Sequence, residues 1–328
     1  MSRIRPIVVL AALLALAGAS TPPAHAAYRG ANGLIAFVRP SSADSSVGDI
    51  WTVRPNGTSP RRLTFTGDNS WPSWSPNGTQ IAFTSSRAGS DDIWVMNADG
   101  TGLRRVTAAA SAERYPTWSP DGRWLAFSSD RPTTDPENPR AFLYKLRSTR
   151  PYGTAIRLTW SGVNDVGGYD YDWRPSWSTL GTIYFTREFR WPGDYEPPWS
   201  SIFSVPGAGG AQTDVLPAGL GGSGWSGDVS PDGGQLVWSA DQGSDGYYDP
   251  PLEIMIRDAS GTIRELTPER QLFTTQNPAW SPDGTRIAYD RVTVNTGAAQ
   301  IMTIRPDGTQ GTTVVANGVS PSWQPLPR

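Results

Sequence analysis

A short phrase built on tryptophan repeats along the chain and constrains its fold more than any other feature. Its full form reads Trp-Ser-Pro-Asp-Gly, or Asn in place of Asp. Six anchor positions carry it in full, altered or truncated form: Trp74, Trp118, Trp177, Val229, Trp280 and Trp323. The intervals between successive anchors are 44, 59, 52, 51 and 43 residues. A repeat of this length is typical of β-propeller blades.

The residues that follow each of the first five anchors predict strands. After Trp74, apolar runs occupy 81–84 and 93–96, and a third run over 103–107 follows a Gly-containing turn. Short runs of β-branched and aromatic residues between Gly, Pro and Asp turns are typical of strands. Together with the segment around the anchor, each unit has four antiparallel strands. The repeat therefore predicts an all-β fold in which each unit is one propeller blade.

The two ends of the repeat supply complementary fragments. Residues 32–64 contain the last three strands of a unit, and residues 319–324 contain a first strand with nothing after it. Pairing the two fragments would complete one blade and remove the open edges of a linear array. The sequence therefore predicts a six-bladed β-propeller closed by pairing of the C-terminal strand with the N-terminal blade.

The best-preserved unit, from Trp74 to Thr107, resembles the TolB-type (WD-like) β-propeller repeat. The likeness lies in the phrases Trp-Ser-Pro-Asn-Gly, Ile-Ala-Phe, Asp-Ile-Trp-Val-Met and Arg-Arg-Val-Thr, and the repeated pattern extends over about residues 32–325. The resemblance implies a propeller domain. It implies little about function, because propellers are scaffolds for many roles.

The N-terminus has the pattern of an export signal. Arg3 and Arg5 precede an apolar run over 7–17, and Ala24-His25-Ala26 forms an Ala-x-Ala cleavage site. This pattern predicts a signal peptide over residues 1–26 and a propeller over 27–328. We expect a secreted or periplasmic protein that has no membrane contact after cleavage. An uncleaved membrane anchor is the alternative.

Composition excludes several kinds of site. The chain has no Cys, and its one His is His25, which would leave with the signal peptide. A Ser-His-Asp triad, a thiolate nucleophile and a His-based metal site would then be impossible. We expect no cofactor and no metal. The net charge of −2 without a basic cluster argues against nucleic acid as a partner. Catalysis is the less favoured expectation and would have to rest on carboxylates, Lys, Tyr, Arg or hydroxyls.

The longest predicted connections all lie on one face of the ring, because strands of a meander alternate in direction. They cover residues 39–48, 129–140, 160–174, 187–200, 217–227 and 240–252. Connections longer than strand pairing needs are often functional. Aromatic residues and one arginine in them are the candidate ligand-binding residues: Tyr169, Tyr171, Trp173, Arg174, Trp191, Tyr195, Trp199, Tyr247 and Tyr248. We expect a non-catalytic propeller that binds a protein or peptide partner through this face.

Two other interpretations of these residues remain open. The aromatic rings could simply pack the insertions onto the propeller. They could also stack on sugars, in a lectin or in a glycosidase that uses two carboxylates. The carboxylates considered for that reaction are Asp170, Asp172, Asp194 and Glu196. Three further acidic residues, Asp241, Asp245 and Asp249, are more typical of a solvated turn than of a calcium loop.

Overall fold

The computed structural model describes residues 30–42, 47–131, 140–160, 169–190, 199–216, 224–240, 252–268 and 272–327. All regular secondary structure in this part of the chain is β-strand, which confirms the predicted all-β class. Nowhere among these residues is there a helix long and apolar enough to cross a membrane.

Four separate sheets each contain four antiparallel strands in chain order. The first consists of β8 (Glu113–Trp118), β9 (Trp124–Ser129), β10 (Phe142–Arg147) and β11 (Ile156–Arg157). The second consists of β12 (Tyr169–Trp177), β13 (Thr182–Arg190), β14 (Trp199–Pro206) and β15 (Thr213–Asp214). The third consists of β16 (Gly224–Val229), β17 (Leu236–Ala240), β18 (Glu253–Arg257) and β19 (Ile263–Glu265). The fourth consists of β20 (Phe273–Trp280), β21 (Ile287–Thr293), β22 (Ala299–Ile304) and β23 (Thr312–Ala316).

The remaining strands form one eight-stranded sheet. One of its two meanders consists of β24 (Val319–Leu326), β1 (Ala31–Pro40), β2 (Gly48–Val53) and β3 (Arg61–Arg62). The other consists of β4 (Asn69–Trp74), β5 (Gln80–Ser85), β6 (Asp92–Asn97) and β7 (Arg104–Arg105). The only residue pair that joins β2 to β4 is Gly48 with Asn69.

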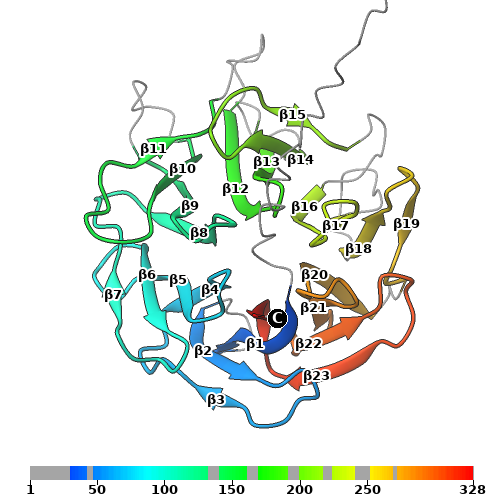
Figure 1. Ribbon diagram of the computed structural model, residues 1–328. Coiled ribbons are helices and arrows are strands. Elements are labelled where there is room, and N and C mark those ends of the chain that lie inside the picture. Colours follow the sequence, from blue (N-terminus) through cyan, green and yellow to red (C-terminus); the bar gives the residue numbers. More distant parts are fainter. Residues whose placement is uncertain are drawn as a thin grey trace, which may run out of the picture.

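The sheets stand around a central axis in chain order, with β4, β8, β12, β16 and β20 innermost (Figure 1). The C-terminal strand β24 pairs with β1, and the paired residues include Ile35 with Trp323 and Ala36 with Ser322. The structure thus contains the predicted pairing between the two ends of the repeat. The overall architecture is a β-propeller.

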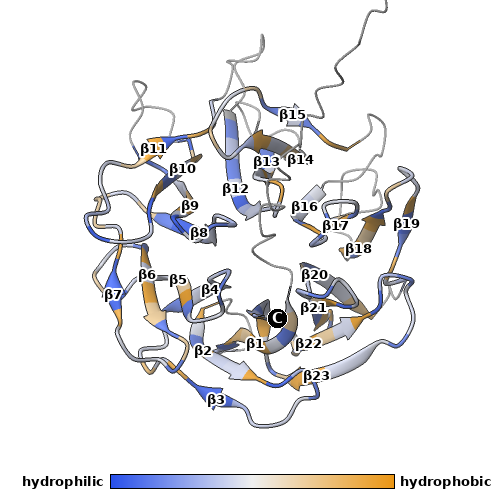
Figure 2. Cartoon of the chain, viewed as in Figure 1, coloured by the Kyte–Doolittle hydropathy of each residue, from blue (hydrophilic) through white to orange (hydrophobic). Residues whose placement is uncertain are grey.

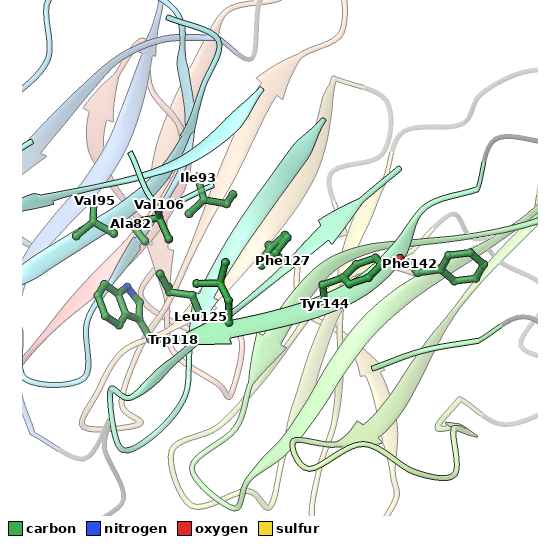
Figure 3. Packing of buried hydrophobic residues seen from close by; sticks show 10 residues of the cluster. Ala82, Ile93, Val95, Val106, Trp118, Leu125, Phe127, Phe142 and Tyr144 are labelled. Atoms are coloured by element: carbon green, nitrogen blue, oxygen red, sulfur yellow. The ribbon is translucent and has the colours of Figure 1, made fainter. Parts of the chain in front are cut away.

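The apolar core lies between neighbouring meanders. Trp118 and Leu125 pack against Ile93 and Val95 of the preceding meander (Figure 3). The indole N–H of Trp118 also donates to the carbonyl of Ser73 across this boundary, at 3.1 Å. A wide, flat side chain fills the space between two twisted sheets, which explains why the anchor of the repeat is so often tryptophan. The outermost strands β3 and β7 are polar (Figure 2).

The turn after each of the first five anchors is closed by the same hydrogen bond, from a Gly amide to a Ser carbonyl three residues before it. In the first copy, the amide of Gly78 donates to the Ser75 carbonyl at 2.8 Å, and Gly78 has a φ of 68°. The Ser75 hydroxyl bonds to Asn77 at 2.7 Å and accepts from the Gln80 amide at 2.9 Å. Gly tolerates this left-handed conformation without steric cost, so the phrase is a turn signal as well as a packing signal.

Two faces differ in their connections. The links from first to second and from third to fourth strands form the short-turn face. The links from second to third strands, and from each fourth strand to the next meander, form the long-connection face. The structure shortens some predicted long connections: β12 already begins at Tyr169, β13 continues to Arg190, and β16 begins at Gly224. The β12–β13 ladder extends into the predicted connections, because each residue from Tyr169 to Trp173 has a cross-strand partner on β13.

Candidate binding site in the central channel

Each of the five innermost strands, and the C-terminal strand β24, contains a β-bulge that places one residue at the channel. The residue at that position has a positive φ although it is not glycine. The six residues, with φ between 49° and 58°, are Trp71, Tyr115, Arg174, Ser226, Asn277 and Ser320. Each lies three residues before its anchor and is followed by Pro, or by Gly in β16. We call these residues the bulge ring.

The bulges are visible in the strand registers. In β4, Ser70 pairs with Thr84 and Ser73 with Ala82, so two residues face one on the partner strand. A bulge of this kind re-aims a side chain, and a left-handed residue other than Gly costs on the order of 1–3 kcal/mol. Side chains of neighbouring meanders stabilise it. For example, the Tyr115 amide donates to the Thr84 hydroxyl at 3.2 Å.

The bulge ring borders a cavity of about 210 Å³ on the channel axis. Towards the short-turn face, its wall includes the anchors Trp74, Trp177, Trp280 and Trp323. Their indole N–H groups are buried and have no hydrogen-bond partner among the described residues. A water molecule needs only about 10–15 Å³ of such volume, so the cavity has room for a ligand group as well as several waters.

Arg174 of β12 reaches from its own strand to two others. Its Nη1 donates to the Oδ1 of Asn277 at 2.7 Å and to the hydroxyl of Ser226. The guanidinium carbon also lies 4.5 Å from the ring centre of Trp71 and 5.7 Å from that of Tyr115. Hydrogen bonds on one side and aromatic faces on the other hold the cation in the channel.

Aromatic rings from three strands adjoin one another beside this cation. Trp71 and Tyr115 have ring centres 4.8 Å apart, and Tyr115 meets Trp173 edge-on at 6.0 Å. Trp173 stacks on Tyr171 at 5.7 Å with an interplanar angle of 3°. Tyr171 and Trp173 lie two residues apart on β12, so they share one face of that strand.

Asp290 anchors the opposite side of the channel wall. It is fully buried, accepts from the Asn277 side-chain amide at 2.6 Å, and accepts from the Ser320 backbone amide at 2.8 Å. Burial away from water raises the pKa of Asp290 to about 8, although these hydrogen bonds and Arg174 act in the other direction. Asp290 therefore positions the side chain of Asn277, which in turn orients Arg174.

Asp228 of β16 is a second carboxyl in the wall. It accepts from the Ser176 hydroxyl at 2.6 Å, the Trp280 amide at 2.7 Å and the Val229 amide at 3.0 Å. Removal from water raises its pKa as well. Because it bonds to β12, to β20 and to its own strand, Asp228 links three neighbouring meanders.

The structure brings together three of the nine predicted site residues: Tyr171, Trp173 and Arg174. They lie on the innermost strand β12 and not on a loop, because the predicted 160–174 connection ends before Tyr169. Tyr169 and Trp199 belong to β12 and β14, and only their strand positions are described. The others lie outside the described residues: Trp191, Tyr195, Tyr247 and Tyr248.

Two of the predicted glycosidase carboxylates have structural partners. Arg187 donates to both oxygens of Asp172, at 2.7 and 2.8 Å, and its Nε lies 4.0 Å from Asp170. Asp172 is fully buried, and burial raises the pKa of Asp170 although Arg187 acts against the shift. Asp194 and Glu196 lie outside the described residues, as do Asp241, Asp245 and Asp249. In the part of the chain that is described, no three acidic or imidazole groups gather as metal ligands would.

Sequence reasoning missed the other members of the bulge ring: Trp71, Tyr115, Ser226, Asn277 and Ser320. A signal for them exists in the repeat. Five of the six ring residues precede a proline two residues before the anchor. In sequence alone an X-Pro step is compatible with a turn or with extended backbone, and the strand register reveals the bulge.

Comparison with known proteins gives the fold of the chain. Residues 45–151 match the sequence model of the Tricorn protease N-terminal beta propeller domain. No curated protein sequence matches the chain.

Among solved structures, TolB from Acinetobacter baumannii is 19% identical with a TM-score of 0.66, covering 89% of this chain and 67% of that one. Putative TolB from Agrobacterium tumefaciens is 17% identical with a TM-score of 0.61, covering 87% and 89%. Hydrazine synthase from Kuenenia stuttgartiensis is 15% identical with a TM-score of 0.69, and the match covers 92% of this chain but about half, 48%, of that one. At these identities the likeness concerns the fold alone: the chain contains a β-propeller domain similar in fold to that of TolB.

Proposed function

We propose that the chain is an exported, non-catalytic propeller that binds a protein or peptide partner through its long-connection face. We take each of the four separate sheets, and each of the two meanders of the eight-stranded sheet, as one blade of a six-bladed propeller. The proposal also includes cleavage of the signal peptide predicted over residues 1–26, which lie outside the described residues. Secretion or release into a periplasm would then present the propeller without a membrane anchor.

The observation that carries the proposal is the aromatic and cationic cluster at the channel. Trp71, Tyr115 and Trp173 come from three different strands and converge beside Arg174. Trp, Tyr and Arg are the side chains that most often dominate the binding energy of protein interfaces. Exposed apolar residues extend the surface outwards on the long-connection face, where the side chain of Phe65 is 72% exposed and that of Trp160 is 50% exposed.

A glycan-active propeller is the alternative, and the geometry supports it less. The bidentate contact with Arg187 makes Asp172 part of a buried ion pair, and such a group is poorly placed to attack or protonate a sugar. The rings of Tyr171 and Trp173 stack on each other, so their facing sides are not free for a sugar ring.

Site-specific photo-crosslinking tests the proposed face. Phe65 in the long-connection face and Leu180 in the short-turn face are matched probes, because they are 72% and 73% exposed. A photoreactive phenylalanine analogue would replace one or the other in the full chain, expressed in its host. We expect discrete crosslinked species from position 65 and none from position 180, identified by mass spectrometry. Equal crosslinking from both positions, or none from either, would contradict the proposal.

The alternative has its own measurement. Binding to a glycan array together with release of reducing sugar from a polysaccharide would favour the carbohydrate function. A protein that crosslinks a partner at position 65 and binds no glycan on the array would leave the protein-binding function as the better one. The variant Glu196→Gln tests the enzymatic form, because loss of sugar release in it would identify a catalytic carboxylate.

A further inference from the structure

The channel contains a cation with unused hydrogen-bonding capacity. Both protein acceptors of Arg174, the Ser226 hydroxyl and Asn277 Oδ1, are bonded to the same nitrogen, Nη1. Across the described residues, Nε and Nη2 have no hydrogen-bond acceptor. These two nitrogens form one edge of the guanidinium, and their parallel N–H groups match the two oxygens of a carboxylate.

The charge of Arg174 also has no ion-pair partner. None of the ion pairs formed among the described residues includes Arg174. Asp228 and Asp290, the carboxyls of the channel wall, are engaged by donors of the protein itself: Ser176, Trp280, Val229, Asn277 and Ser320. A cation that is held in place by neutral acceptors and aromatic faces therefore borders an open cavity.

The cavity wall contains buried polar groups without a hydrogen-bond partner among the described residues. The hydroxyl of Ser320 lines the cavity, is buried, and has no partner in the described structure. Four anchor tryptophans that line the cavity have unpaired indole N–H groups, which can only donate. A negatively charged ligand group that accepts several hydrogen bonds would give these donors a partner and would balance the charge of Arg174.

We propose that the free Nε–Nη2 edge of Arg174 binds a carboxylate of the peptide partner inside the channel. This inference rests on the proposed function and names the group that the site recognises. A peptide can supply that group from its C-terminus or from an Asp or Glu side chain. A sugar acid fits the site less well. The guanidinium already occupies one face of Trp71 at 4.5 Å, and Trp71, Tyr115 and Trp173 are tilted against one another, so they do not form one flat platform for a pyranose.

Random-sequence octapeptide pools test the proposal on the unmodified full chain. The first pool lacks Asp and Glu and has a free C-terminus. The second lacks Asp and Glu and is amidated at the C-terminus. The third is amidated but contains Asp and Glu. Peptides retained on the immobilised protein are quantified by mass spectrometry. We expect the second pool to be depleted about tenfold or more relative to at least one of the others, which also shows whether the C-terminus or a side chain supplies the group.

Variants of Arg174 locate the contact. For the best retained peptide, calorimetry should give an affinity about ten- to a hundredfold weaker with Arg174→Gln and an intermediate loss with Arg174→Lys, which keeps the charge but not the fork. Arg123→Gln is the matched control, because this arginine is 80% exposed in a turn of the short-turn face. It should bind like the unmodified chain. Near-ultraviolet circular dichroism checks that each variant is folded, and the comparison of pools needs no variant at all.

The outcomes separate the two proposals. Equal retention of all three pools, or unchanged affinity in folded Arg174→Gln, would overturn the carboxylate inference and leave the peptide-binding function standing. Retention of none of the pools would overturn both. An oligomer of galacturonic acid serves as a further probe. If it binds while no peptide pool does, the ligand is a sugar acid and the peptide assignment is wrong.

Discussion

The two halves of the bulge ring share one backbone geometry and have opposite chemistry. On β4, β8 and β12 the ring residues are Trp71, Tyr115 and Arg174, and on β16, β20 and β24 they are Ser226, Asn277 and Ser320. We call these the aromatic half and the polar half. The same left-handed bulge thus presents large apolar or cationic groups on one side of the channel and small polar groups on the other. The repeat determines where a side chain points, and the residue at that point determines what it can bind.

The supporting residues differ in the same way. In the aromatic half, the Thr84 hydroxyl accepts the amide of the next ring residue, Tyr115. At the corresponding place in the polar half, a carboxyl group, that of Asp290, accepts the amide of Ser320. Likewise, the amide of Trp177 is accepted by the hydroxyl of Thr117, whereas Asp228 accepts that of Trp280. At two positions, Asp290 and Asp228, the polar half thus has a carboxyl where the aromatic half has a hydroxyl, and Arg174 of the aromatic half reaches across the channel to Asn277, which bonds to Asp290.

The largest expected effect tests whether the anchor tryptophans of the two halves contribute equally to the free energy of unfolding. Trp74 lies under the aromatic half and Trp280 under the polar half, and both are buried between meanders. Replacing either by Ala leaves a large cavity and should lower the free energy of unfolding by about 3–5 kcal/mol. Urea denaturation measures both variants. A cost below about 1 kcal/mol for one of them would show that the two halves already differ at the level of the anchors.

The next effect concerns the buried carboxyl of the polar half. The pKa of Asp290 is raised to about 8 in the folded protein, whereas an unfolded aspartate titrates near 3.9. Between these values the folded state holds a proton that the unfolded state has lost. Stability from this group is therefore greatest at low pH, falls as the pH rises towards about 8, and changes little above it. The slope is at most about 1.4 kcal/mol per pH unit.

Asp290→Thr gives the polar half the kind of side chain that Thr84 supplies in the aromatic half. We compare the free energy of unfolding of this variant with that of the unmodified chain. Between pH 5 and pH 8, we expect the unmodified chain to lose about 2–4 kcal/mol more than the variant does. The converse change, Thr84→Asp, should introduce a similar slope into the aromatic half. Thermal or urea unfolding at several pH values measures both. Parallel pH profiles for all three proteins would show that Asp290 keeps an ordinary pKa.

The sequence predicts the scaffold well because each structural signal is local and repeated. The anchor, its Pro-Asp-Gly turn and the apolar runs are contiguous, and the incomplete ends indicate how β24 meets β1. The channel site is harder to predict. Its members come from separate meanders, and whether Tyr115 or Asn277 points into the channel depends on a bulge and a positive φ. Cross-strand pairing explains the error at β12, where Arg187 binds Asp172 and extends a strand that the sequence suggested was a loop.

The smallest expected effect compares how Arg174 couples to the two halves. Its bond to Asn277 is a charge-assisted hydrogen bond of 2.7 Å, and its contact with Trp71 is a cation–π interaction at 4.5 Å. Double-mutant cycles of unfolding free energy isolate each term. We expect the cycle of Arg174→Met with Asn277→Ala to give a coupling of about 1.5–3 kcal/mol. We expect the cycle of Arg174→Met with Trp71→Leu to give about 0.5–2 kcal/mol.

A third cycle pairs Arg174→Met with Trp94→Leu and serves as the control, because Trp94 contacts Arg87 instead. Its coupling should stay within about 0.5 kcal/mol of zero. If the Trp71 coupling proves larger than the Asn277 coupling, the cation belongs energetically to the aromatic half. The polar half would then contribute little to holding Arg174, and the contact with Trp71 would determine how the free edge of Arg174 is oriented. A larger Asn277 coupling would instead mean that the polar half orients the edge available to a ligand.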